Sequence, residues 1–115
     1  MVHKLDLTNF AILKNAASYP MWAFQIKIAF DAEDLMRFVD GTTPVDGVPP
    51  DQISLWHTKD AEAKLYIMMT TDQMVNQHLI TCNTSKQMYD KLRNIYEKDT
   101  EHQRCHLLQE LYSYK

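Results

Sequence analysis

The clearest helix signal in the chain lies at residues 18–32, SYPMWAFQIKIAFDA. Ser18 can cap this helix, and Pro20 fits its first turn, where the missing proline N–H costs no hydrogen bond. Apolar residues recur at helical spacing on one face: Trp22, Ile26, Ala29 and Phe30. A second face carries Met21, Phe24 and Ile28. The pattern therefore predicts a helix that is apolar around most of its girth and central to the fold.

Residues that break helices concentrate in one loop after this segment. Both glycines and three of the four prolines lie within residues 41–50. Before that loop, Asp34 is expected to cap a short helix at residues 35–39, and Gly41 is expected to end it in the left-handed conformation. Residues 5–13 are ambiguous and are compatible with a segment lying extended on the core.

Four further helices are indicated downstream. A long one spans residues 51–70, and Thr71 with Asp72 caps a shorter one that reaches residue 80. Thr84 and Gln87 form a capping-box pattern that opens a helix ending near residue 97. Thr100 and Gln103 repeat the pattern before a last helix rich in leucine and tyrosine.

These elements predict an all-α fold, an irregular bundle of five or six helices. The domain is expected to span residues 1–99, with residues 100–115 as a terminal helix that docks on the domain, on a second chain, or on both. Eight residues are predicted to form the core: Trp22, Ile26, Phe30, Trp56, Ala63, Ile67, Leu92 and Tyr96.

The amino-acid composition argues against several classes of function. The net charge of −3 gives no excess of lysine and arginine for holding a phosphate backbone. Two cysteines are too few for a disulfide framework or a cysteine-rich zinc site. No signal peptide and no apolar run of membrane-spanning length is visible, so a cytoplasmic protein that does not enter a membrane is expected.

Four blocks, taken in order, resemble the Gag proteins of copia-type retrotransposons across nearly the whole chain. The blocks are Tyr19-Pro20-Met21-Trp22; Val39-Asp40-Gly41 with Pro44; Trp56, Asp60, Ala63 and Ile67; and residues 84–97, TSKQMYDKLRNIYE, followed by LLQELY at 107–112. The resemblance implies the N-terminal domain of a capsid protein, a structural role without catalysis, and self-association or contact with other Gag proteins. The second capsid half and the zinc knuckle of the family do not fall within residues 1–115, so nucleic-acid binding is not expected.

Several residues could carry chemistry, but each has an ordinary structural alternative. His102, Cys105 and His106, and the pair His78 and Cys82, have helical spacings that could hold a metal, but a tetrahedral site needs four ligands, and no metal site is expected. No phosphate loop, nucleophile elbow or metalloprotease motif is present, so neither an enzyme nor a cofactor is expected. Trp22 and Trp56 are interpreted as core residues rather than base-stacking platforms.

Surface residues give the remaining expectations. The basic residues Lys86, Lys91, Arg93 and Lys98 alternate with Asp90 and Glu97, which favours a mixed solvated face over a nucleic-acid site. Met68 is interpreted as flexible core filler. Five residues of the last helix are candidates for self-association: Leu107, Leu108, Leu111, Tyr112 and Tyr114. The alternative function is a domesticated Gag-derived module that binds another protein, for example the capsid of its parent element.

Overall fold

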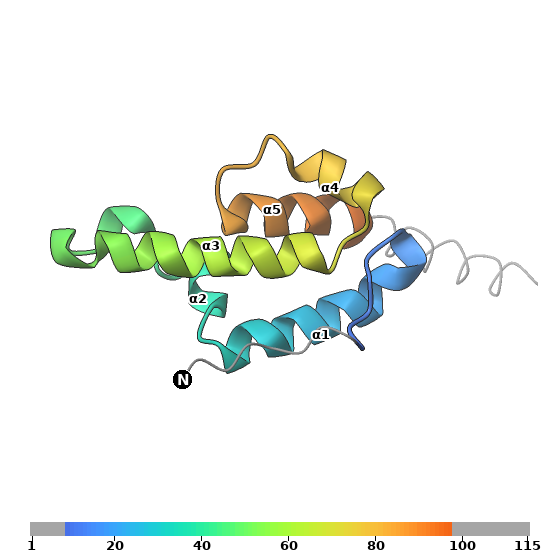
Figure 1. Ribbon diagram of the computed structural model, residues 1–115, viewed down its shortest axis with the longest axis horizontal. Helices are drawn as coiled ribbons and strands as arrows, with labels where there is room; N and C mark the ends of the chain where they lie inside the picture. Colours follow the sequence, from blue (N-terminus) through green and yellow to red (C-terminus); the bar gives the residue numbers. More distant parts are fainter. Residues whose placement is uncertain (1–8, 98–115) are drawn as a thin grey trace, which may run out of the picture.

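The computed structural model describes residues 9–97, and helices form almost all of the regular structure in that range (Figure 1). The elements are a 3-10 turn Ala16–Ser18, α1 Tyr19–Ala32, α2 Met36–Val39, 3-10 turns Val45–Gly47 and Pro50–Gln52, α3 Ile53–Met69, α4 Gln73–Leu79, α5 Ser85–Leu92, and a π-helical turn, η4, Arg93–Glu97. The prediction of an all-α fold is confirmed.

The core lies where α1, α3 and α5 come together. In Figure 1 the long α3 crosses the middle of the molecule, with α1 on one side and α4 and α5 on the other. All eight residues predicted for the core are buried. Aromatic rings join the layers, since the Phe30 ring meets Tyr89 edge-on at 6.3 Å and the Tyr19 ring stacks on Tyr96 at 6.1 Å.

An extended segment before α1 completes the core. Leu13 is fully buried, and its backbone bridges the end of α3: its N–H donates to the Thr70 carbonyl at 2.8 Å, and its carbonyl accepts from Asp72 at 3.1 Å. Thr70 also receives the indole N–H of Trp22 at 2.8 Å, a buried contact. Of the ambiguous segment, the structure describes residues 9–13, and Leu13 there lies on the core and forms an isolated bridge with Thr71.

Two expected caps are wrong. Ser18 makes no capping bond to α1, because its hydroxyl is bonded to Asn15, which caps the preceding turn. Asp34 does not cap α2 but takes a left-handed conformation, φ 57°, and its carboxylate pairs with Arg37 at 3.1 Å. Gly41 does adopt the expected left-handed conformation, with φ 85°.

The caps of α4 and α5 agree more closely with the predictions from sequence. The Asp72 carboxylate accepts the Val75 N–H at 2.9 Å and opens α4. Thr84 accepts the Gln87 N–H at 3.1 Å and opens α5, but the Gln87 side chain accepts from Asn83 and not from Thr84. The Gln87 side chain therefore bonds the backbone one residue before the N-cap, and the predicted capping box is only half formed. None of the helices within residues 9–97 is long and apolar enough to cross a membrane.

Candidate functional site

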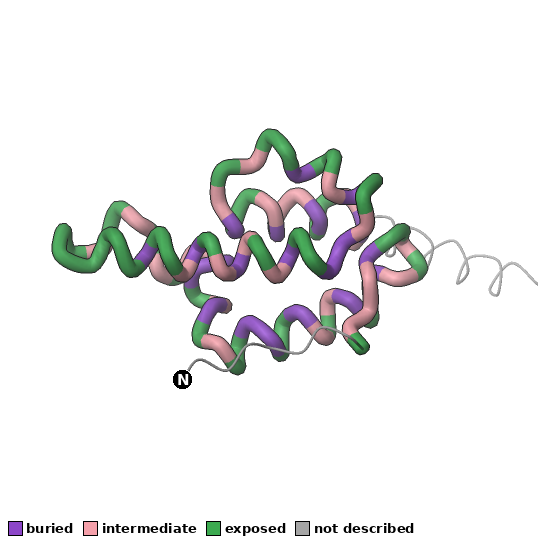
Figure 2. The backbone as a smooth tube through the Cα atoms, viewed as in Figure 1, coloured by how far each residue is buried: buried purple, intermediate pink, exposed green. Residues whose placement is uncertain are grey.

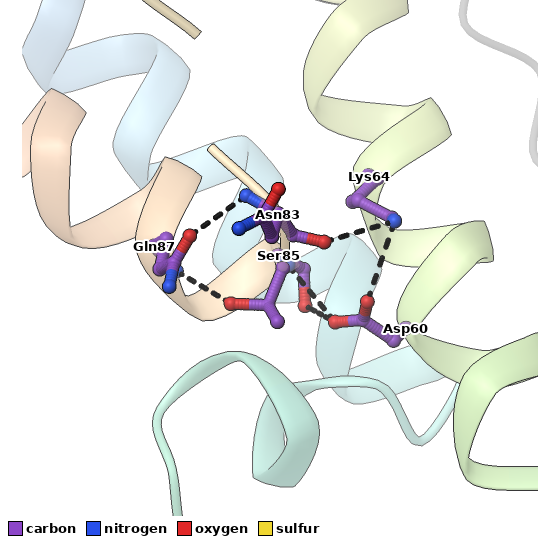
Figure 3. A network of polar contacts seen from close by, with 6 residues as sticks. Asp60, Lys64, Asn83, Ser85 and Gln87 are labelled. Atoms are coloured by element: carbon purple, nitrogen blue, oxygen red, sulfur yellow. Dashed lines mark hydrogen bonds and ion pairs between the residues drawn. The ribbon is translucent and has the colours of Figure 1, made fainter. Parts of the chain in front are cut away.

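A buried carboxylate fixes the relative position of the two helices that carry the most specific sequence blocks. Asp60 on α3 accepts two hydrogen bonds from Ser85, the first residue of α5, from its N–H at 2.9 Å and its hydroxyl at 2.6 Å (Figure 3). Lys64 lies 3.6 Å from the other Asp60 oxygen and donates to the Asn83 carbonyl. Asp60 thus caps α5 from a neighbouring helix, where a negative charge also favours the helix dipole.

Trp56 serves the same kind of structural purpose one turn earlier on α3. Its indole N–H donates to the Thr43 carbonyl at 2.7 Å, and its ring meets Phe38 edge-on at 6.2 Å. The Trp-Asp-Ala-Ile pattern of α3 therefore ties this helix to the loop before it and to α5. The Trp56 indole and the Asp60 carboxylate are thus both hydrogen-bonded within the fold.

The exposed face of α1 is the first candidate for a functional surface. Met21, Phe24 and Ile28 remain 55%, 63% and 54% exposed, although the opposite face of the same helix is buried (Figure 2). We call these three residues the α1 stripe. No element within residues 9–97 covers this side of α1, although its opposite face lies in the core.

A groove adjoins the α1 stripe at Phe24. It has a volume of about 710 Å³ and is bounded by α1, α2, α5 and η4. Its apolar lining includes Ala23, Phe24, Met36 and Tyr89, and charged residues stand around it: Lys27, Asp40, Arg93 and Glu97. An apolar floor with charged residues around it is also the general make-up of protein–protein contact surfaces.

One end of the groove is closed by a polar contact between α1 and η4. The Tyr19 hydroxyl donates to the Glu97 carboxylate at 3.1 Å, and that carboxylate also pairs with Arg93 at 3.4 Å. Burial, reinforced by the hydrogen bond and the negative charge of Glu97, raises the pKa of Tyr19 above its ordinary range. The phenol is therefore held neutral as a donor and is a poor base at physiological pH.

A second exposed apolar face lies on α3. Leu65, Met68 and Met69 point away from the buried side of this helix, and each is about half exposed. We call these residues the α3 outer face. The interpretation of Met68 as core filler is wrong, because the side of α3 on which it lies has no covering element in the described part of the chain.

The other predicted site residues divide into three groups. His78 is exposed and Cys82 half-buried, and no cluster of three or more metal-ligating side chains occurs within residues 9–97. Of the basic residues, Lys86 pairs with Asp90 at 2.6 Å and Arg93 with Glu97 at 3.4 Å, and Lys98 lies outside the described residues. The terminal candidates lie outside the described residues: His102, Cys105, His106, Leu107, Leu108, Leu111, Tyr112 and Tyr114, as does the boundary expected at residues 99–100.

The sequence shows the α1 stripe as a second apolar face of the helix, but it does not show whether another element covers that face. Its spacing shows only that three apolar residues share a helix side, and a buried side and a contact surface give the same pattern. The feature that distinguishes a contact surface from a buried side is the presence of two apolar faces on one helix. A 14-residue helix in a small domain has few neighbouring elements that could cover both faces.

Comparisons with known proteins agree with this architecture. The family model described as the gag-polypeptide of LTR copia-type matches residues 26–115. The retrovirus-related Pol polyprotein from transposon RE2 of Arabidopsis thaliana is 30% identical over 91 residues, covering 70% of this chain and 6% of the relative. The chain thus spans a small part of that relative's length. No solved structure matches. With 90 of its 115 residues matched, the chain belongs to the family of copia-type LTR retrotransposon Gag polypeptides.

Proposed function

We propose that this chain is a structural, non-catalytic Gag domain whose copies associate through apolar helix faces to build a capsid-like assembly. The observation that carries the proposal is the α1 stripe, three large apolar side chains that stay more than half exposed on a helix whose other face is buried. Apolar surface left in water favours association at roughly 25 cal/mol for each Å² buried.

The membership in the Gag family and the engagement of the buried polar residues support this reading. Asp60, Ser85 and Thr70 are each hydrogen-bonded within the fold, so their polar groups have structural partners. No buried side-chain nitrogen or oxygen within residues 9–97 lacks a hydrogen-bond partner. Many weak apolar contacts between copies can together give an assembly a high overall affinity.

Sedimentation velocity and negative-stain electron microscopy of the purified chain test the proposal. Concentration-dependent growth into higher oligomers or closed particles is the expected result. Discrete dimers without particles would favour the alternative, a domesticated module that binds other Gag proteins. A monomer at millimolar concentration would contradict the proposed assembly.

The helix expected over residues 100–115 is a second candidate contact. Leu111→Asp combined with Tyr112→Asp is expected to weaken association while the helical circular dichroism signal is kept. Loss of the folded signal in this variant would place both side chains in the core of the domain and would remove them from the proposed contact.

A further inference from the structure

We propose that the α1 stripe is a homotypic contact in which α1 packs antiparallel against α1 of a second copy around a twofold axis. This inference rests on the proposed function and names the surface that performs it. The stripe follows the spacing i, i+3, i+7, so Met21, Phe24 and Ile28 lie in one row. The row extends about 10 Å along the helix, which is the length of two turns.

The distribution of charge favours a second copy as the occupant of this surface. Between Tyr19 and Ala32 the only charged residues are Lys27 and Asp31, which have opposite signs. Asp31 continues the row one turn beyond Ile28, but in an antiparallel pair centred near Phe24 the two Asp31 residues lie at opposite ends, about 20 Å apart along the helix. Two copies can therefore bring their stripes together without placing like charges face to face, which a twofold contact requires because it pairs a surface with itself.

The antiparallel register corresponds to a twofold axis perpendicular to α1, since an axis along the helix would pair the two copies in parallel. A twofold axis near Phe24 and Gln25 places Met21 of one copy opposite Ile28 of the other, so the two flanking apolar residues cover each other across the axis. The stripe offers only a few hundred Å² per copy, since each large side chain exposes on the order of 100 Å². Even when both copies are counted, that area lies below the roughly 1,200 Å² of total surface that a stable dimer buries, and it fits a weak contact repeated in an assembly.

The α3 outer face is a poorer candidate for pairing with itself. Its equivalent row, at the same spacing i, i+3, i+7, begins with a charged residue, since Glu62 precedes Leu65 and Met69. Glu62 is only loosely paired with Lys59, at 3.9 Å. The same antiparallel arrangement on α3 would place the Glu62 carboxylate opposite Met69 of the other copy. Covering a carboxylate with an apolar side chain removes it from water without a new partner, which opposes association.

Phe24→Glu tests the surface, with Met69→Glu on the α3 outer face as the matched control. The two side chains have similar exposed fractions, 63% and 53%, so each variant places one carboxylate on a solvent-facing apolar position. Phe24→Glu is expected to raise the dissociation constant at least tenfold in sedimentation equilibrium, and Met69→Glu to change it less than threefold. The reverse order would overturn the inference.

Disulfide cross-linking tests the register. Met21→Cys and Ile28→Cys are made separately in the full chain with Cys82→Ala and Cys105→Ala, and the two proteins are mixed under mild oxidation. The antiparallel contact predicts that the mixed 21–28 disulfide exceeds either disulfide between identical variants by several-fold. A predominance of disulfides between identical variants would show a parallel contact and overturn the inference.

Failure of the inference is distinguishable from failure of the proposed function. If the wild-type chain associates but Phe24→Glu does not alter its dissociation constant, copies associate through another surface, and only the α1 contact is wrong. If Phe24→Glu lowers the unfolding midpoint without changing association, the same chain covers the stripe, and the α1 contact is again wrong. If the wild-type chain stays monomeric at millimolar concentration, the proposed function fails with it.

Discussion

Replacing Asp60 with alanine is expected to be among the most destabilising single substitutions in the domain. Asp60 is 3% exposed and accepts both Ser85 donors, and Ser85 itself is fully buried. The substitution leaves the Ser85 N–H and hydroxyl without this acceptor, and each buried unsatisfied donor costs about 1–3 kcal/mol. We therefore expect Asp60→Ala to lower the free energy of unfolding by about 2–5 kcal/mol, a large part of the total for a small domain.

Two further substitutions distinguish the contribution of the cap to the free energy of unfolding from that of the ion pair. Asp60→Asn keeps an acceptor oxygen but removes the charge, and it is expected to cost about 1–2 kcal/mol, because hydrogen bonds to charged groups are roughly twice as strong as neutral ones. The Lys64 side chain is 34% exposed and remains near water. Lys64→Ala is therefore expected to cost less than about 1 kcal/mol.

Urea unfolding monitored by far-ultraviolet circular dichroism measures all three variants, and a constant slope with denaturant shows that the unfolded reference state is unchanged. The expected order of destabilisation is Asp60→Ala, then Asp60→Asn, then Lys64→Ala. If Lys64→Ala were as costly as Asp60→Ala, the ion pair and not the capping of α5 would stabilise this contact. If Asp60→Ala cost less than about 0.5 kcal/mol, as surface substitutions do, the capping role would be refuted.

Three further predictions concern the core, the loop and the groove. Thr70→Val keeps the side-chain shape but leaves the buried Trp22 N–H without its acceptor. The substitution should lower the free energy of unfolding, measured by urea titration, by about 1–3 kcal/mol. An unchanged free energy of unfolding would show that another group accepts that N–H. Gly41→Ala should lower the thermal midpoint, because φ 85° costs an L-residue roughly 1–2 kcal/mol, and an unchanged midpoint would mean that the loop relaxes freely. The raised pKa of Tyr19 means that the folded state holds the phenol proton more tightly than the unfolded state. This stabilisation is full below the ordinary value of about 10 and is lost as the pH rises from there towards the higher pKa of the folded state. Stability should therefore fall less steeply above about pH 10 in Tyr19→Phe than in the wild type, and equal slopes in urea titrations across that range would exclude Tyr19 as a source of the alkaline loss.

The sequence by itself determined the helical class, the helix order and the core residues. Trp22, Ile26 and Phe30 on one helix and Trp56, Ala63 and Ile67 on another repeat at the period of a buried helix face, and all are buried. The period of a helix is a local property, so it can be read without knowing which elements meet. The caps at Asp72 and Thr84 were predictable for the same reason, since each donor lies within three residues of its acceptor.

Only the tertiary structure decided which apolar faces are covered and which polar residues act across helices. The α1 stripe and Met68 have the sequence pattern of core residues, but their exposure depends on whether another helix lies over them. Asp60 caps a helix that begins 25 residues later in the chain, and no local spacing encodes that contact. Both outcomes depend on which helices become neighbours, and the packing of the whole chain sets that arrangement.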